Sequence, residues 1–424
     1  MKLAALIIFI LMYILIIKFQ DLKEYIALGT ALGFIALGIL PPDKILDVLK
    51  NNYSIFMMLI GSMIVVYYFV KSNMPALIAD KLLDISPNVL WVTILMSAFS
   101  SFISIFIDNT ATVLMIAPIA IAICKKVKIN PVPMILCLAI SSNMQGVAIL
   151  VGDTTSIMLG WYAKMNFVDF FIMNGKPSIF FAVELGALVA LIVMIFMFRK
   201  RKEKVVASND VEVNDYFPTI VVIALILSLV ASSVFPKGTD IINGIICVGY
   251  ALISMIGDVS KHKVDNQILD SLKNIDFQTI FLLIGLFFVI GGINNVGLIE
   301  DFASGIFNIG GTDPFLLYTI IVFGSVFISS FTDNIPYIAT MLPVVQRMCM
   351  MTSINPNLLY FGLMIGATLG GNITPIGASS NITAVSILNR QGYKVGFKDF
   401  LKYGLPLTLS AIITGYLFVW FVWK

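Results

Sequence analysis

Two Asp-Asn pairs lie inside long apolar runs of this chain, and they constrain its fold more than any other feature. The first is in Ser104-Ile-Phe-Ile-Asp108-Asn109-Thr110 and the second in Ser329-Ser-Phe-Thr-Asp333-Asn334. Each run reaches a proline, and both the carboxylates and the prolines are 225 positions apart (108 to 333, 118 to 343). A carboxylate at the centre of a membrane helix costs about 2.5–3.5 kcal/mol on insertion scales. The recurrence indicates a function; the plain alternative is two buried polar pairs that only hold helices together.

The composition predicts a membrane protein. Of the 424 residues, 59% are hydrophobic and 12% are charged, whereas a soluble domain has about 25% charged residues. Many apolar windows reach the roughly 17–20 residues that cross a bilayer as a helix. The net charge of +3 gives no case for a nucleic-acid partner, and the four cysteines have no metal-ligand spacing. We expect an all-α polytopic protein of the cell (inner or plasma) membrane, in contact with lipid and a small ionic substrate, without a cofactor other than Na⁺ or H⁺.

Candidate spans follow the same order on both sides of a polar loop at 199–216. Short polar stretches also match across the loop, such as Ile45–Asn51 with Ile268–Asn274. We therefore predict two repeats, 1–198 and 217–424, joined by a 199–216 linker. The spans of the first half are 3–18, 24–40, 53–71, a split pair 89–107 and 111–124, 131–150 and 178–198; those of the second are 217–235, 240–257, 278–296, a split pair 314–331 and 335–349, 357–371 and 403–422.

The split pairs predict re-entrant hairpins with their Asp-Asn tips at mid-membrane, where irregular backbone must be buried in protein or line a cavity. Each half then has about five transmembrane helices plus one hairpin. An odd number of crossings inverts the second half relative to the first, as in many secondary transporters. Most of the 27 Lys and Arg residues then fall on the side of the linker. The positive-inside rule predicts a cytoplasmic linker, both termini outside, the first hairpin opening inward and the second outward.

The hairpin tips and the polar stretches that follow them, 152–156 and 372–381, are expected to converge on one polar cavity. Broken helices leave backbone N–H and C=O groups free for ligands. Carboxylate, amide and hydroxyl oxygens are the ligands that hard cations prefer. The candidate substrate- and ion-binding residues are Asp108, Asn109, Thr110, Asp153, Thr154, Thr155, Ser156, Asp333, Asn334, Asn372, Thr374, Ser379, Ser380 and Asn381, with Na⁺ expected at Asp108, Asn109, Asp333 and Asn334.

These motifs contain no Lys, Arg or His. An anionic substrate would therefore be attracted by helix N-termini and hydroxyl groups. Asp108, Asp153 and Asp333 would couple transport to a cation or, because burial favours a protonated carboxyl group, to a proton. Structural alternatives are a helix cap for Asp153 and close helix packing for Ser379–Asn381.

At these residues the chain resembles the ion-transporter superfamily, which includes arsenite permeases, NhaD-type sodium/proton antiporters, citrate and dicarboxylate symporters and the P protein. Asp333-Asn334-Ile-Pro is similar to the Asp-Asn-Ile-Pro of P-protein and NhaD-like members. Gly371-Asn-Ile-Thr-Pro-Ile-Gly-Ala-Ser-Ser-Asn381 resembles their Gly-Asn-x-Thr-x-Ile-Gly-Ala-Ser-x-Asn. The resemblance covers nearly the whole chain and implies two inverted repeats, a mid-membrane site, alternating access and, in many members, a homodimer.

The resemblance also implies roles for single residues. Positions that bind or couple ions in the superfamily fall on Asp108, Asn109, Asp153, Thr155, Asp333, Asn334, Ser379 and Asn381. Two departures stand out. Asp108 and Asp333 replace the Ser of dicarboxylate symporters, which argues against a dicarboxylate substrate. Thr154-Thr155-Ser156 replaces the usual Pro-Pro-Asn, which weakens the match to P-protein and antiporter members.

Three functions are consistent with these residues. The leading one is a secondary transporter that moves a small anion or oxyanion, as arsenite and citrate permeases do, coupled to Na⁺ or H⁺ by symport or antiport. The second is an NhaD-type Na⁺/H⁺ antiporter, favoured by three membrane carboxylates and no basic site residue. The third is an intramembrane aspartyl protease. The repeat argues against any such enzyme, because a carboxylate dyad needs no third carboxylate at matched spacing.

Overall fold

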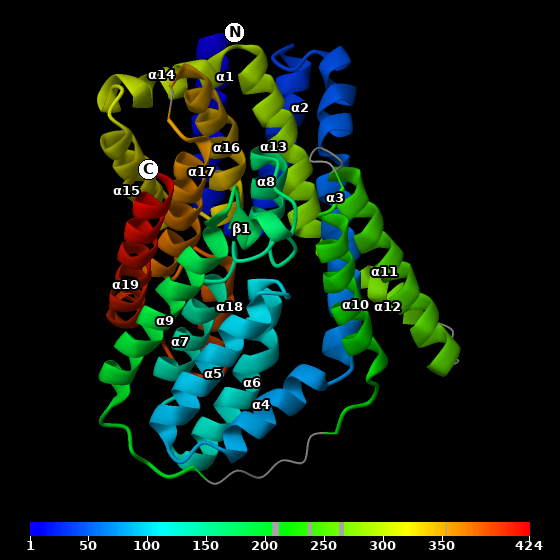
Figure 1. The fold of residues 1–424 in the computed structure, drawn as a ribbon, viewed down its shortest axis with the longest axis vertical. Coiled ribbons are helices and arrows are strands. Elements are labelled where there is room, and N and C mark those ends of the chain that lie inside the picture. The colour runs from blue at the N-terminus through cyan, green and yellow to red at the C-terminus, as the bar shows by residue number, and fades with distance from the viewer. Residues whose placement is uncertain (206–211, 236–239, 263–266, 353) are drawn as a thin grey trace.

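The fold consists almost entirely of helices, as the computed structural model in Figure 1 shows; it describes residues 1–424 except 206–211, 236–239, 263–266 and 353. Within these residues, six helices are long and apolar enough to cross a membrane, or seven if the bent pair formed by α1 with η1 and α2 is one span. The predicted all-α polytopic membrane class is confirmed.

The elements of the first half precede the linker. They are α1 (Lys2–Lys18), η1 (Gln20–Leu22), α2 (Lys23–Ala36), α3 (Pro42–Lys71), α4 (Met74–Asp84), α5 (Val89–Ser104), α6 (Asn109–Val127), α7 (Val132–Asn143), α8 (Thr154–Ala163), η2 (Val168–Phe170), β1 (Ile172–Met173), β2 (Lys176–Pro177) and α9 (Ile179–Phe198). The two short strands pair antiparallel, with Ile172 opposite Pro177.

The elements of the second half follow a similar order, with no strand among the residues that the structure describes. They are α10 (Phe217–Ser232), α11 (Asp240–His262), α12 (Gln267–Lys273), α13 (Phe277–Asn295), α14 (Leu298–Gly310), α15 (Pro314–Ser329), α16 (Asn334–Met351), α17 (Pro356–Met364), the π-helical turn η3 (Ile365–Leu369), η4 (Gly371–Ile373), α18 (Ser379–Arg390) and α19 (Phe397–Trp423).

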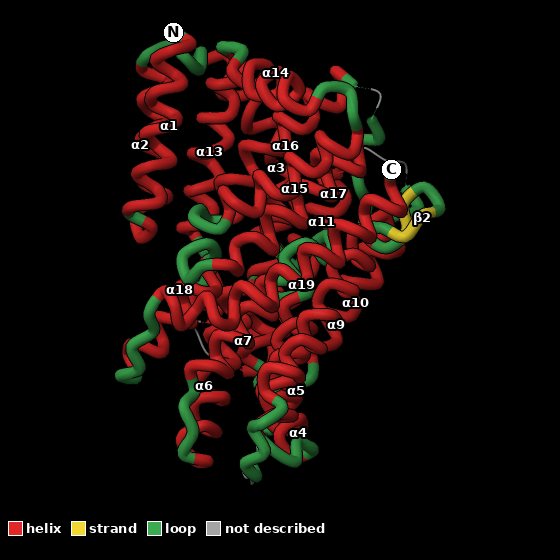
Figure 2. Tube along the Cα trace, turned by 90° about the vertical axis from the view of Figure 1, so that its left-hand side faces the viewer, coloured by secondary structure: helices red, strands yellow, loops and turns green. Residues whose placement is uncertain are grey.

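The two series have opposite orientations. In Figures 1 and 2, α4, α5 and α6 lie at the lower end of the molecule, whereas α14, α15 and α16 lie at the upper end. Equivalent glycines make equivalent contacts between the halves. A Cβ on Gly61 of α3 would lie 2.5 Å from the carbonyl carbon of Cys247 in α11, and one on Gly285 of α13 would lie 2.6 Å from that of Ala27 in α2. The duplicated sequence therefore folds into an inverted pair.

The predicted spans differ from the helices where polar residues or glycines interrupt them. The expected helix over 131–150 ends at Asn143 and resumes as α8 at Thr154, after an irregular segment. The expected helix over 357–371 passes into a π-helical turn at Ile365. Helix α2 has 14 residues, about 21 Å, which is less than the roughly 30 Å of a hydrocarbon core. Five full crossings per half therefore stay a prediction.

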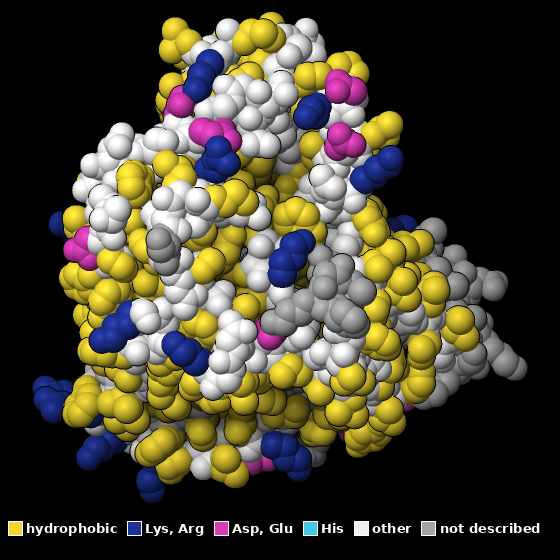
Figure 3. All heavy atoms as spheres, turned by 45° about the horizontal axis from the view of Figure 1, so that its top comes forward, with side chains coloured by type: hydrophobic (Ala, Val, Ile, Leu, Met, Phe, Trp, Pro, Cys, Tyr) yellow, Lys and Arg dark blue, Asp and Glu magenta, His cyan; other side chains and the backbone are white. Residues whose placement is uncertain are grey.

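Helices at the surface present apolar side chains outward. On α9, Phe181, Leu185, Leu188, Ile192 and Phe196 are all exposed, and their spacing of three or four residues places them on one face. Figure 3 shows broad hydrophobic areas on the visible surface, with charged side chains at wide intervals. Such a face suits lipid tails.

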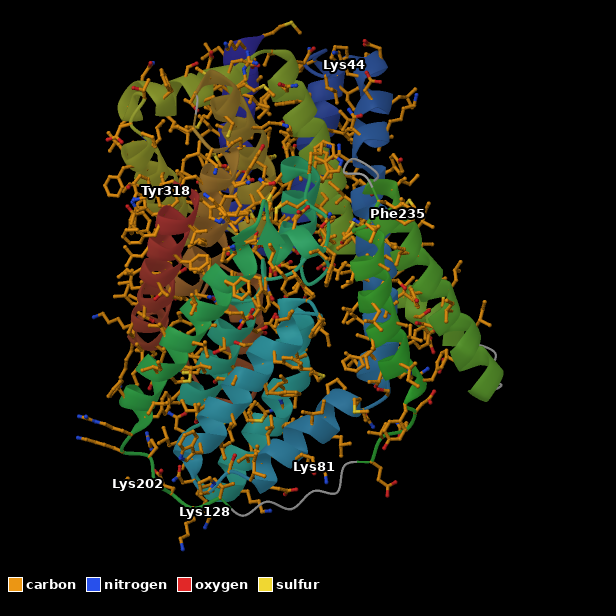
Figure 4. The ribbon with its side chains drawn as sticks, in the orientation of Figure 1. Lys44, Lys81, Lys128, Lys202, Phe235 and Tyr318 are labelled. Carbon is orange, nitrogen blue, oxygen red and sulfur yellow. The ribbon has the colours of Figure 1, made fainter. Side chains whose placement is uncertain are left out.

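Lysine residues lie at both ends of the molecule. Lys81, Lys128 and Lys202 lie at the lower end, and Lys44 lies at the upper end (Figure 4). Both chain termini lie in the upper half. This grouping matches the predicted arrangement, in which the linker is opposite both termini; residues 206–211 of that linker lie outside the described residues. Which end faces the cytoplasm stays a prediction.

Candidate functional site

Both hairpin tips open onto one cavity of about 470 Å³. The tips are the breaks between α5 and α6 and between α15 and α16, and the opposite wall comes from α1, η1, α2 and the start of α13. Eight of the fourteen predicted site residues line it: Asp108, Asn109, Thr110, Asp153, Asp333, Asn334, Ser379 and Ser380. The predicted convergence of the four polar segments is therefore present in the structure, while the role of these residues in binding stays a prediction.

The duplicated sequence gives the two tips the same local structure. Asp108 (φ −48°, ψ 140°) precedes α6, and Asp333 (φ −59°, ψ 141°) precedes α16. The asparagine that follows each aspartate is buried. The Ser104 hydroxyl donates to Asn109 Oδ1 at 2.7 Å, and the Ser329 hydroxyl lies 2.8 Å from the side-chain amide of Asn334.

The two carboxylates have different partners. Asp108 is exposed to the cavity, and among the described residues its Oδ1 accepts from the backbone amides of its own helix, Thr110 at 2.9 Å and Ala111 at 3.1 Å. Asp333 is buried, and its Oδ2 lies 2.5 Å from Nζ of Lys23. The two tips therefore match in backbone structure, but among the described residues only Asp333 has a basic partner.

Buried asparagines connect the two halves behind the tips. Asn109 Nδ2 donates to Asn143 Oδ1 and to Asp153 Oδ2, each at 3.1 Å. Asn143 Nδ2 donates to Asn372 Oδ1 at 3.0 Å, and Asn372 Nδ2 donates to the Ile140 carbonyl at 3.2 Å. Since amides can donate and accept at once, this network fixes the register of both broken helices.

The other predicted residues lie behind the cavity wall. Thr155 donates to the Gly146 carbonyl at 2.7 Å, and Asp153 with Ser156 forms a capping box at the start of α8, which also buries Thr154. The helix-cap alternative for Asp153 is thus correct, although the same carboxylate lines the cavity. On the second side, the Thr374 hydroxyl donates to the Ser330 carbonyl, and Asn381 Nδ2 donates to the Gly371 carbonyl at 3.2 Å.

Two glycines let the broken helices touch the hairpins. A Cβ on Gly152 would lie 2.2 Å from the Ile105 carbonyl oxygen, and one on Gly377 would lie 2.8 Å from the Ser330 carbonyl oxygen. The glycines are 225 positions apart, and so are their partners (152 to 377, 105 to 330). No side chain fits at either position.

Sequence reasoning missed several wall residues. Lys23 and Asp276 line the cavity, although the motifs predicted a site without a basic residue. Asp276 begins α13 and accepts from Thr279 N at 3.1 Å. Asn143 also lines the cavity. The polar run Ser141-Ser142-Asn143 inside an apolar span could have identified it from the sequence. No sequence pattern identifies Lys23, because its partner Asp333 is 310 positions away.

Acidic side chains outnumber basic ones in the described cavity wall. Among the described residues that line it, five are carboxylates (Asp21, Asp108, Asp153, Asp276 and Asp333) and one is basic, Lys23. Two buried oxygens beside the wall, Ser380 Oγ and Asn381 Oδ1, have no hydrogen-bond partner among the described residues. An acidic cavity with unpaired oxygens suits a cation.

A second pocket, of about 320 Å³, lies toward the other ends of α13 and α16. Asn294 of α13 and Gln346 of α16 line it, together with Asn52 of α3. Arg347 and Glu300 form an ion pair there at 3.6 Å. Helices α13 and α16 therefore line a polar space near each of their ends.

Comparisons with known proteins agree with this architecture. By shape, the chain is similar to the YdaH transporter of Alcanivorax borkumensis, with a TM-score of 0.61, 12% identity and coverage of 90% of this chain and 89% of that one. It is also similar to Neisseria gonorrhoeae MtrF, described as illuminating a class of antimetabolite efflux pumps, with a TM-score of 0.57, 17% identity and coverage of 89% and 84%. These likenesses show that the chain shares the fold of these two proteins.

Sequence comparisons are more specific. An uncharacterized transporter of Mycobacterium tuberculosis is 26% identical over 432 residues, 99% of this chain and 98% of that protein. The mouse P protein is 22% identical over 447 residues, 86% of this chain and 53% of that protein. The sequence profile of the citrate transporter family CitMHS matches residues 11–304 and again 267–424. Because these matches span nearly the whole sequence, the chain belongs to the CitMHS citrate transporter family, within the ion-transporter superfamily.

Proposed function

We propose that this secondary transporter moves a small anionic solute, of the citrate or oxyanion type, together with Na⁺ or H⁺ by alternating access. The observation that carries the proposal is the acidic character of the cavity, where the described wall residues include five aspartates and one lysine. An anion entering this space is repelled unless cations accompany it, since unit charges 4 Å apart interact by about 4 kcal/mol at an effective dielectric constant near 20. Coupling to a cation follows from that repulsion.

Oxygen atoms near both tips support bound cations. The Asp108 carboxylate faces the cavity with no basic partner among the described residues. Ser380 Oγ and Asn381 Oδ1 are buried and unpaired near the second tip. A buried oxygen without a donor costs about 1–3 kcal/mol, and a cation would remove that cost.

The two pockets support alternating access. The larger cavity meets the start of α16 at Asn334, and the smaller pocket meets its last turns at Gln346 and Arg347. The route proposed for the solute runs along α13 and α16 between these spaces. We place the linker in the cytoplasm, as the distribution of lysine and arginine predicts.

Uptake into proteoliposomes tests this function. Labelled citrate, phosphate, sulfate and arsenite are supplied in turn, with an inward Na⁺ gradient, a pH gradient or neither. We expect one solute to accumulate only with a cation gradient, and Asp108→Asn to abolish the gradient dependence. Asp301→Asn is the matched control, because Asp301 pairs with Lys2 at the surface and is not among the described residues that line the cavity. Accumulation that ignores every gradient and Asp108→Asn contradicts the proposal.

A second candidate is exchange of Na⁺ for H⁺ without an anion. The excess of carboxylates in the cavity favours it. The same liposomes, loaded with a pH-sensitive dye and given Na⁺ in the absence of any organic or oxyanion solute, decide between the two. A proton flux under these conditions supports the exchanger; its absence together with solute uptake supports the symporter.

A further inference from the structure

The ammonium group of Lys23 contacts the kind of oxygen atoms that would bind a metal cation. Its Nζ donates to Asp333 Oδ2 at 2.5 Å and to Ser379 Oγ at 3.3 Å. The Ser379 hydroxyl also donates to Asp333 Oδ2 at 2.8 Å. One ammonium group therefore contacts a carboxylate and a hydroxyl oxygen in the wall of the cavity of about 470 Å³.

Among the described residues, only the second hairpin tip has a lysine beside its aspartate. The contact of Gly285 with Ala27 and that of Gly61 with Cys247 relate α2 to α11 by 220 positions (27 to 247), and the Ile45–Asn51 match gives 223 (45 to 268). Position 23 thus corresponds to Asn243 or Ile246, neither of which is basic. Lys23 is an addition to one side of a symmetric structure, so it is not required for the hairpin fold itself.

The ion pair also joins two separate parts of the cavity wall. Lys23 begins α2, whereas Asp333 and Ser379 belong to the second hairpin and to α18. The Lys23 side chain is 16% exposed and that of Asp333 is 9% exposed, and both residues line the cavity. A flexible four-carbon stem lets the ammonium group leave Asp333 while it stays in the same space.

We propose that Lys23 is a tethered cation that fills the Asp333–Ser379 subsite until a solute cation displaces it, and that the released ammonium group then contacts the anionic solute. The exchange leaves Asp333 compensated at all times. It also provides the one basic group of the described cavity wall to the anion only when the cation is bound. The part that concerns the anion rests on the proposed function; the part that concerns the cation does not.

Cation binding by the purified full-length protein tests the exchange. Thermal unfolding is measured against NaCl, with choline chloride holding the ionic strength constant. Lys23→Met keeps the apolar stem and removes the competitor, so the half-saturating Na⁺ concentration should fall by about tenfold, or about 1.4 kcal/mol. Adding Asp333→Asn should abolish that gain. The control Lys2→Met removes another lysine that pairs with an aspartate and should leave the Na⁺ response unchanged.

Amine footprinting tests the same exchange in the unaltered protein. An acylating reagent read out by mass spectrometry should modify Lys23 several times faster in saturating Na⁺ than in choline, with no change at Lys2. Equal or weaker Na⁺ binding by Lys23→Met, a gain that survives Asp333→Asn, or a Lys23 reactivity that Na⁺ leaves unchanged or lowers would each overturn the proposal.

The anion is tested separately. Citrate and the three oxyanions are added at saturating Na⁺, and the solute that stabilises the unaltered protein should fail to stabilise Lys23→Met. If that solute stabilises both proteins equally, the released ammonium group does not contact it. If none stabilises the unaltered protein while the Na⁺ results hold, the exchange stands and the proposed substrate class is wrong.

Discussion

Asn143 donates from Nδ2 to Oδ1 of Asn372 at 3.0 Å, and this bond joins the broken helix of the first half to that of the second. Asn143 also accepts from Asn109 at the first hairpin tip. Both partners of the central bond are buried. A single amide thus links one tip to the opposite half, and the two halves of the cavity share one polar network.

Asn143→Ala should destabilise the protein by about 1–3 kcal/mol, because it leaves Asn372 Oδ1 and Asn109 Nδ2 without this buried partner. Thermal unfolding in detergent measures the loss. Asn308→Ala is the control, since Asn308 is an exposed residue of α14. A melting temperature of Asn143→Ala equal to that of the control would show that the network adds no stability.

Gly152→Ala and Gly377→Ala should each prevent a hairpin from packing against the broken helix that it contacts. The added methyl carbon would lie 2.2 Å from the Ile105 oxygen in the first case and 2.6 Å from the Gly371 oxygen in the second. Both contacts involve backbone, which cannot rotate away as a side chain can. We expect little folded protein by size-exclusion chromatography. Gly324→Ala, on α15 with open space around its Cβ position, should fold normally; equal yields for all three variants would contradict the close packing.

Asp333→Asn and Asp108→Asn should differ in stability although the two tips match in sequence. Asp333→Asn leaves the Lys23 ammonium without its counter-ion, a change that costs about 3–5 kcal/mol in fully buried pairs and less here because the pair is partly exposed. Asp108→Asn keeps the helix cap, for which Asn serves as well as Asp. A double-mutant cycle with Lys23→Met measures the coupling, and a coupling near zero would show that the pair adds no stability.

Cysteine labelling should separate the two ends of the molecule. In a Cys349→Ser background, Lys44→Cys should react with a membrane-impermeant maleimide in intact cells. Lys128→Cys and Lys202→Cys should react only after permeabilisation, because they lie at the opposite end. The remaining cysteines, Cys124, Cys137 and Cys247, are buried and should stay silent. The reverse pattern would place the linker outside.

The positions of the breaks were predictable because they depend on local sequence. Asp, Asn and Gly inside apolar runs are costly in a continuous membrane helix, so they mark where helices end. After both tips the helix begins at the residue that follows the aspartate, Asn109 and Asn334, close to the predicted starts at 111 and 335. The short helices α4, α8, α14 and α18 were missed as elements of their own, since each has 10 to 13 residues and gives a weak apolar signal.

The sequence by itself determined the membrane class, the duplication and the residues at the two tips, because hydrophobic length and repeated motifs are read along the chain. Only the tertiary structure decided that Lys23 neutralises Asp333 while Asp108 stays open to the cavity. That pairing joins residues 310 positions apart. Neighbours in space depend on how α2 packs against the second hairpin, and no local pattern around Lys23 records that contact.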